Sequence, residues 1–188
     1  NLGSIAMICS LANEPHATAE TLRADLTEIG QVAAESADSM RDMVQLISPR
    51  ASSGDAHWLE VLRRLCGRLL RGVSVTCDLP DQPLPLEPDV ETRRELYLFC
   101  KEVLHNIARH ASASRARLRI QNTPHGIRVH ITDNGAGFDP AQTTTGHGLG
   151  NLRERASVLG ADLHLFSKPG AGTVVRLDVP ATTRWTRT

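Results

Sequence analysis

The chain has 188 residues, which fits one large domain or one domain with an appendage. Its hydrophobic residues, 40% of the total, are enough to form a core. Its 21 basic and 21 acidic residues cancel, so charge gives no reason to expect a nucleic acid or an acidic partner. The four cysteines form no CxxC pair, which argues against a zinc site and favours reduced thiols in a cytoplasmic protein; no membrane span or signal peptide is visible.

The first 48 residues have the pattern of a helical hairpin or coiled coil. Between residues 17 and 47, apolar positions recur in alternating steps of four and three, which is a heptad seam broken only by Ser36. One helix cannot bury such a seam alone, so we expect dimerisation; a core helix of one globular domain is the alternative. The seam consists of Leu22, Leu26, Ile29, Ala33, Ser36, Met40, Met43 and Ile47.

A polar linker is expected at residues 49–56, and a globular domain at residues 57–180. Strands and helices mix there without strict alternation, which predicts an α/β sandwich with a mixed sheet and helices on one face. The proline-rich stretch at residues 80–89 is expected to end regular structure, and residues 181–188 to form a disordered tail. Helices are expected at residues 58–70, 90–111 and 149–160, and strands at residues 73–79, 116–122, 126–133, 161–167 and 173–179.

The helix predicted at residues 90–111 carries polar residues at a spacing of four. Glu102, Asn106 and His110 are therefore expected on one side, beside Arg109. The carboxylate and the carboxamide offer hard oxygen ligands that suit Mg²⁺ bridging phosphates, and Arg109 and His110 offer donors to phosphate oxygens. Taken by itself, this helix is better explained by a polar face exposed to solvent.

The stretch "ITDNGAGFDP" ends a predicted strand in an acid and two glycines. Asp, Asn and Gly are turn residues, so a tight turn is one interpretation. The other is a ligand site, in which Asp133 accepts a hydrogen bond from an exocyclic amine and the bare backbone of Gly135 and Gly137 lets a planar base approach.

A second glycine-rich stretch precedes the helix that is expected to begin near Leu149. Bare amides at a helix N-terminus form an anion site, and Gly146, His147 and Gly148 stand at that position. The polar segment at residues 139–145 has the length and composition of a lid. Neither a P-loop nor the G-x-G-x-x-G order of a dinucleotide fold is present.

Taken in order, "KEVLHNIARHA", "DNGAGF", "GHGLGNLRERA" and "PGAGTVVRLDVP" resemble the motifs of the GHKL ATPases. More narrowly they resemble the sensor histidine kinases that partner NarL-type response regulators. The resemblance implies a Bergerat-type sandwich that binds ATP and Mg²⁺, preceded by part of a dimerisation and phosphotransfer bundle. In it Asp133 would bind the adenine amino group with support from Thr173, Asn106 would ligate Mg²⁺, and Glu102 would assist catalysis or help to hold the metal. The nucleotide-binding residues would be Asn106, Arg109, His110, Asp133, Gly135, Gly137, Gly146, His147, Gly148, Leu149 and Thr173.

The same resemblance implies transfer of the γ-phosphoryl group to a histidine of the bundle and then to an aspartate of a response regulator. The sequence begins in mid-pattern and without Met, so we expect a fragment whose acceptor histidine lies a few residues before Asn1. Homodimerisation through the bundle is expected, without direct nucleic-acid binding. The fragment would be cytoplasmic, and any anchoring in the inner membrane would come from upstream segments. The alternatives are an anti-sigma-type serine kinase with the same ATP fold and a non-catalytic interaction module with a vestigial site.

Overall fold

The structure is a computed structural model that describes residues 19–47, 57–80, 84, 86–140, 147–182 and 184–187. The chain divides into two compact units, Asn1–Ile47 and Ser48–Thr188.

In the first unit, the described residues form one long helix, α2 (Ala19–Ile47). It covers the predicted heptad seam. Three seam residues rank among the most exposed large apolar side chains of the described residues, at 66% for Leu26, 67% for Met40 and 55% for Ile47. Exposed apolar side chains at heptad spacing are typical of a helix that packs against a partner.

A mixed five-stranded sheet forms one layer of the second unit. Its strand order is β1-β3-β4-β6-β5, where β1 and β3 are parallel and the other neighbours are antiparallel. Each strand alternates buried and exposed side chains, so the sheet has one packed face and one open face. The strands are β1 (Ser74–Asp78), β3 (Arg115–Thr123), β4 (Gly126–Asp133), β5 (Asp162–Ser167) and β6 (Thr173–Pro180).

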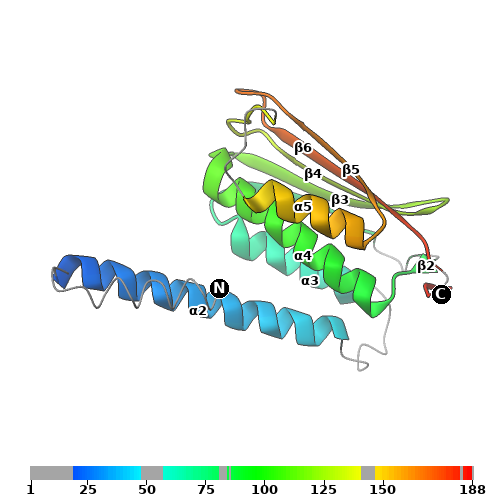
Figure 1. Cartoon of the computed structure of the whole chain (residues 1–188), viewed down its shortest axis with the longest axis horizontal. Helices are drawn as coiled ribbons and strands as arrows, with labels where there is room; N and C mark the ends of the chain where they lie inside the picture. The colour runs from blue at the N-terminus through cyan, green and yellow to red at the C-terminus, as the bar shows by residue number, and fades with distance from the viewer. Residues whose placement is uncertain are drawn as a thin grey trace. The chain divides into compact units, whose positions relative to one another are not determined.

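The packed face is covered by three helices that lie side by side, as Figure 1 shows. They are α3 (His57–Leu69), α4 (Val90–Asn106) and α5 (His147–Val158). Helix α4 supplies large fully buried side chains, among them Leu96, Tyr97 and Phe99, and β3 and β4 supply buried aliphatic side chains on the packed face. This two-layer arrangement of a mixed sheet with helices on one face confirms the fold class that the sequence predicts.

The end of the long helix differs from the sequence expectation. After Asn106 the α-helix gives way to a π-helical turn, η1 (Ile107–Ala111), and Ser112 ends it in the left-handed conformation, at φ 48°. Ile107 and Ala111 of this turn are buried. However, a π turn pairs residues five apart, so α-helical spacing no longer places the residues beyond Asn106.

Two further expectations were wrong for the described residues. The proline-rich stretch contains a short strand, β2 (Leu86–Glu87), and the tail expected to be disordered contains its partner, β7 (Thr186–Arg187). Trp185 anchors this segment because its side chain is buried, with only 7% of its surface exposed. Burial of one large aromatic side chain offsets the entropy lost by ordering a short segment.

Candidate functional site

Glu102 and Asn106 lie one turn apart on α4, and both side chains are half-buried. The helix that carries them is firmly positioned. Its N-terminus is capped by Asp89, whose Oδ1 accepts a hydrogen bond of 2.8 Å from Thr92 N. Its opposite face is packed into the core. The predicted carboxylate and carboxamide are therefore presented together on a rigid element, near the C-terminal end of α4.

The first turn of α5 lies directly over this pair. A Cβ built on Gly148 would lie 3.2 Å from Glu102 Oε1 and 3.3 Å from Asn106 Oδ1. The helix N-terminus, with amides that have no partner within the helix, is thus held beside the side-chain oxygens of Glu102 and Asn106. Three residues that the sequence analysis predicted separately meet at one place.

Helix α5 is tied to α4 by an ion pair that the sequence analysis missed. Arg155 Nη1 donates a hydrogen bond of 3.0 Å to Glu95 Oε2, and Glu95 is only 8% exposed. Leu152 and Ala156 of the same helix are buried. The only sequence signal for Glu95 is a charged residue on the apolar face of a helix, which indicates a buried partner.

Arg109 and His110 lie in the π turn, and the side chains of both are exposed. The turn is held from the loop after β4, because Ala136 N donates a hydrogen bond of 2.7 Å to the Ala111 carbonyl. Among the described residues, neither side chain has a hydrogen bond or an ion pair, so both remain available to an anion. π turns occur often at functional sites.

Asp133 ends β4 on the packed face of the sheet, and its side chain is half-buried. Its Oδ1 accepts a hydrogen bond of 2.7 Å from Gly135 N. This bond closes the tight turn that the motif predicts. Among the described residues, Oδ2 has no hydrogen-bond partner. The carboxylate is therefore fixed by one oxygen and leaves the other to accept a hydrogen bond from a ligand.

The structure gives Gly135 and Gly137 a packing role. A Cβ on Gly135 would lie 2.2 Å from the Ala111 carbonyl oxygen, and one on Gly137 would lie 2.1 Å from that of Lys168. Gly137 also has a φ of +60°, which disfavours any residue with a side chain. The two glycines bring the loop after β4 against its neighbours, and this close packing sets the position of Asp133.

Thr173, the first residue of β6, is the cross-strand partner of Asp133 on the packed face. Its Oγ1 lies 3.0 Å from Ser167 Oγ. Ser167 Oγ also accepts a hydrogen bond from Phe138 N and donates one to the Gly172 carbonyl, at 2.9 Å each. The single hydroxyl proton of Ser167 is donated to the Gly172 carbonyl, so in the contact with Thr173 the Thr173 hydroxyl is the donor. Thr173 therefore faces Asp133 as an acceptor, able to receive a hydrogen bond from an amine or a water.

The structure describes less of the remaining predicted site residues. Leu149 is half-buried in the first turn of α5. Gly146 and most of the segment expected to form a lid, 141–145, lie outside the described residues, and so does the side chain of His147. Within the described part of the chain, no cluster of three or more His, Cys, Asp or Glu residues could hold a metal ion.

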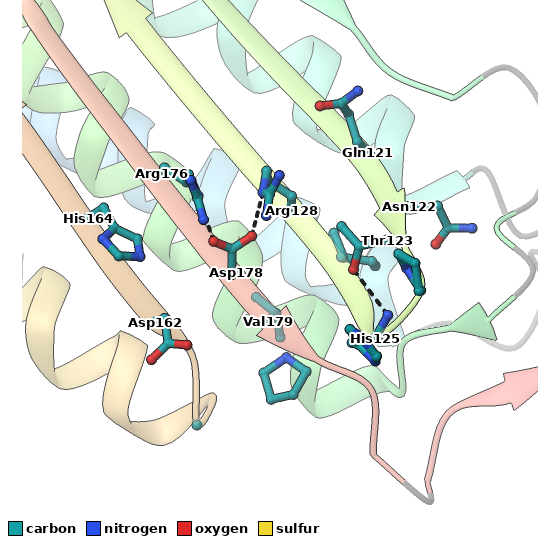
Figure 2. A pocket seen from close by; sticks show the side chains of 14 residues that line it. Gln121, Asn122, Thr123, His125, Arg128, Asp162, His164, Arg176, Asp178 and Val179 are labelled. Carbon is teal, nitrogen blue, oxygen red and sulfur yellow. Dashed lines mark hydrogen bonds and ion pairs between the residues drawn. The ribbon is translucent and has the colours of Figure 1, made fainter.

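A shallow groove of about 700 Å³ lies elsewhere, on the open face of the sheet (Figure 2). Its lining includes Arg128 and Arg176, and both donate to Asp178. The groove adjoins the start of β4, whereas Asp133 is at the other end of this strand, roughly 23 Å away at 3.3 Å per residue. It lacks the helix N-terminus and the bare backbone of the Asp133 region, so we place the candidate site at the packed face.

Residues 91–183, about half of the chain, match the family model described as "Histidine kinase-, DNA gyrase B-, and HSP90-like ATPase". This stretch contains α4, α5 and the strands that carry Asp133 and Thr173. The chain thus contains an ATP-binding domain of this ATPase family.

Sensor histidine kinases are among the relatives in sequence. The chain is 35% identical to the "Signal transduction histidine-protein kinase/phosphatase DegS" of Brevibacillus brevis over 89 residues, which is 47% of this chain and 23% of that protein. It is 29% identical to the "Nitrate/nitrite sensor protein NarQ" of Escherichia coli K12 over 167 residues, which is 87% of this chain and 28% of that protein. The chain therefore matches about a quarter of the length of these relatives.

Among solved structures, the histidine kinase domain of the blue-light activated histidine kinase of Erythrobacter litoralis EL346 has the same fold. It aligns with a TM-score of 0.61 at 19% identity, over 94% of this chain and 90% of that one. Among the described residues, no helix is long and apolar enough to cross a membrane.

Proposed function

We propose that this chain is the catalytic region of a two-component sensor histidine kinase, which binds ATP with Mg²⁺ and transfers the γ-phosphoryl group to a histidine. One arrangement carries the proposal. An ATPase-family domain holds a free carboxylate oxygen of Asp133 at one strand end, and holds Glu102 and Asn106 beneath the N-terminus of α5.

In the proposed complex, Asp133 Oδ2 accepts a hydrogen bond from the adenine amino group, and Thr173 accepts a second one directly or through a water. The amides at the start of α5, from residues 147–149, face the phosphates. Arg109 and His110 approach from the π turn and donate to phosphate oxygens. Gly146 and His147 complete the cover of the phosphates.

The oxygen donors also fit the metal. Mg²⁺ prefers hard oxygen ligands and keeps several waters, so it is usually bound through one or two protein groups together with substrate phosphates. Asn106 Oδ1 supplies one such ligand, and Glu102 helps to hold the metal or assists the transfer. A pair of ligands is consistent with the lack of a larger cluster among the described residues. The metal neutralises charge on the phosphates, and the protein contributes positioning.

The proposed acceptor is a histidine of a dimeric bundle that includes α2, and the next acceptor is an aspartate of a NarL-type response regulator. The relation to NarQ and DegS supports this assignment. We place the reaction in the cytoplasm, with any membrane anchor outside these residues.

Base recognition is tested by calorimetric titration with a non-hydrolysable ATP analogue and Mg²⁺. Asp133→Asn keeps an oxygen for Gly135 N but turns an amide donor toward the ligand, so the turn survives while the hydrogen bond to the amine is lost. We expect about tenfold weaker binding, roughly 1.4 kcal/mol. The control Asp162→Asn, on the open face, should bind like the wild type. Lack of binding by the wild type would overturn the proposal.

The acceptor chemistry is tested separately, by labelling the intact protein with γ-labelled ATP. Phosphohistidine is acid-labile and stable in base, so a label lost in acid supports the histidine kinase. An acid-stable label on a serine of a partner would support the anti-sigma-type kinase instead. Nucleotide binding without any transfer would favour the non-catalytic module.

A further inference from the structure

The groove on the open face of the sheet plays no part in the proposed kinase site (Figure 2). Its volume of about 700 Å³ is within the range of small-molecule binding sites. Side chains from four neighbouring strands line it, and the strand register places one from each strand in a single row. The floor of the groove is therefore formed by the sheet. This row is Gln121 of β3, Arg128 of β4, Asp178 of β6 and Asp162 of β5.

One carboxylate holds two guanidinium groups in this groove. Arg128 Nε donates to Asp178 Oδ1 at 2.5 Å, and Arg176 Nε donates to Asp178 Oδ2 at 2.6 Å (Figure 2). Among the described residues, the Nη groups of both arginines have no partner, and their side chains are 39% and 41% exposed. His164, opposite Arg176 in the register, adds a further donor, and its ring stacks with that of Phe166 at 6.5 Å. Oriented donors are thus directed to solvent from neighbouring strands.

A second row on the open face, next to the first, has four basic side chains and no acid. Its members lie directly opposite one another, over roughly 14 Å at about 4.8 Å per strand. Like charges that face each other across strands destabilise a sheet. An anion bound here would relieve that repulsion. The row consists of Arg119, His130, Arg176 and His164.

Nearby carboxylates leave this positive charge uncompensated. Asp78 is opposite Arg119 in the register, but it pairs with Arg117 at 2.8 Å. Arg119 itself forms no ion pair within the described ranges. Burial lowers the pKa of His130, and the positive charges of the surrounding arginines lower it further. This part of the open face therefore favours an anion.

The rest of the groove offers hydrogen bonds to uncharged groups. Gln121 and Asn122, near the end of β3, supply side-chain amides. Asp162, on the β5 side, forms no ion pair within the described part of the chain, and its carboxylate can accept hydrogen bonds from hydroxyl groups. Cationic donors beside amides and a carboxylate suit a ligand that has one anionic group and several hydroxyl groups.

We propose that this groove binds a phosphorylated small molecule with several hydroxyl groups, of the sugar phosphate class. The Nη groups of Arg128 and Arg176 donate to the phosphate oxygens, because planar guanidinium groups match the geometry of phosphate and remain charged. Asp178 orients the two guanidinium groups. The hydroxyl groups of the ligand bind to Gln121, Asn122 and Asp162.

Calorimetric titration of the full chain, without nucleotide or Mg²⁺, tests the proposal with three probes. These are ribose 5-phosphate, inorganic phosphate and ribose. We expect ribose 5-phosphate to bind about tenfold more tightly than inorganic phosphate, and ribose not to bind detectably. Absence of ribose 5-phosphate binding would overturn the proposal. Equal affinity for inorganic phosphate would show a simple anion site and would overturn the sugar phosphate class.

Substitutions locate the ligand in the groove. Arg128→Gln and Arg176→Gln should each weaken binding of ribose 5-phosphate by about tenfold or more. Urea denaturation shows whether these two variants are folded, since each removes a hydrogen bond to Asp178. Gln121→Ala breaks no ion pair; it should weaken binding of ribose 5-phosphate by about threefold or more and leave that of inorganic phosphate unchanged.

Arg109→Gln is the matched control, because it removes the same charge from an exposed arginine at the proposed nucleotide site. It should bind ribose 5-phosphate like the wild type. Equal losses in Arg109→Gln and Arg176→Gln would mean that the probe binds at the nucleotide site or responds to net charge alone. Either result, or unchanged affinity in a folded Arg176→Gln variant, would contradict a ligand site in this groove.

Discussion

Gly148, in the first turn of α5, lies against the carboxylate of Glu102 on α4, and a Cβ built on the glycine would come within 3.2 Å of Glu102 Oε1. The Asn106 amide is almost equally near, at 3.3 Å to its Oδ1. The start of α5 and the side-chain oxygens of Glu102 and Asn106 are thus so close that even a methyl group between them would force a small shift. This relationship makes the glycine a test of the proposed metal and phosphate site.

Gly148→Ala should weaken binding of ATP with Mg²⁺ while preserving the fold. The new methyl group would push the flexible ends of Glu102 and Asn106 aside by a few tenths of an ångström, and these ends are the proposed metal ligands. We expect about a tenfold loss of affinity, roughly 1.4 kcal/mol. Alanine is also a better helix former than glycine, so thermal stability should not fall. Calorimetry and thermal denaturation measure the two effects.

Gly150→Ala is the matched control, because it is in the same helix and a Cβ there would meet nothing within 4 Å. It should gain the same helix propensity and keep wild-type affinity. Equal losses of affinity in the two variants would mean that α5 responds to any substitution, and would contradict a specific role for Gly148.

The sequence predicted most of the helices and strands because their hydrophobic patterns repeat over many residues. The alternation in β3 and β4 and the apolar face of α4 gave the sheet and its covering helix directly. The resemblance to the GHKL ATPases also implied that Asp133 and Thr173 cooperate, and the register makes them cross-strand partners. Their pairing depends on which strands are neighbours in the sheet, and periodicity does not encode this order.

The expectations that were wrong concern features fixed by tertiary contacts. The π turn ends where Ala111 meets Gly135 and Ala136, two residues from another part of the chain. The two-residue strands β2 and β7 are too short to show any period, and only their mutual pairing orders them. The ion pair of Glu95 was not predicted at all, because its partner Arg155 is 60 positions further along the sequence.

Glu87→Ala should strongly destabilise the second unit. Glu87 is 1% exposed, and its carboxylate accepts hydrogen bonds from Leu84 N at 2.8 Å and from Trp58 Nε1 at 3.2 Å. Arg93 lies 3.5 Å away. Truncation would leave these donors unpaired, at a cost of about 3–5 kcal/mol. Urea denaturation measures it. The exposed Glu91, which pairs with Arg184, is the control: Glu91→Ala should cost less than about 1 kcal/mol.

The ion pairs of Asp178 should make stability depend on acid pH. Partial burial tends to raise the pKa of Asp178, but hydrogen bonds from Arg128 and Arg176 outweigh it and hold the pKa below 3.8. A carboxyl with a lowered pKa stabilises the fold above its unfolded pKa, and this contribution is lost as pH falls through the folded value. Asp178→Asn should therefore lower the urea midpoint at pH 7 and have little effect once the wild-type carboxyl is protonated.

Asp162→Asn provides the comparison for this pH dependence. Asp162 lies opposite Asp178 in the register of β5 and β6, and it forms no ion pair within the described ranges. Removing this like charge should not lower the midpoint at pH 7. A loss of the same size in both variants would show that the arginine contacts of Asp178 do not contribute to stability.

The heptad seam of α2 gives the last prediction, which concerns the proposed dimer. Met40 is a seam residue that is 67% exposed, so it is available to a partner helix. Met40→Glu would place a charge in the dimer core, where burial of an unpaired carboxylate is costly. We expect at least a tenfold increase in the dimer dissociation constant, measured by sedimentation equilibrium. Ala34→Glu, at an exposed position outside the seam, should leave the dimer intact; equal weakening by both variants, or a monomeric wild type, would contradict dimerisation through this seam.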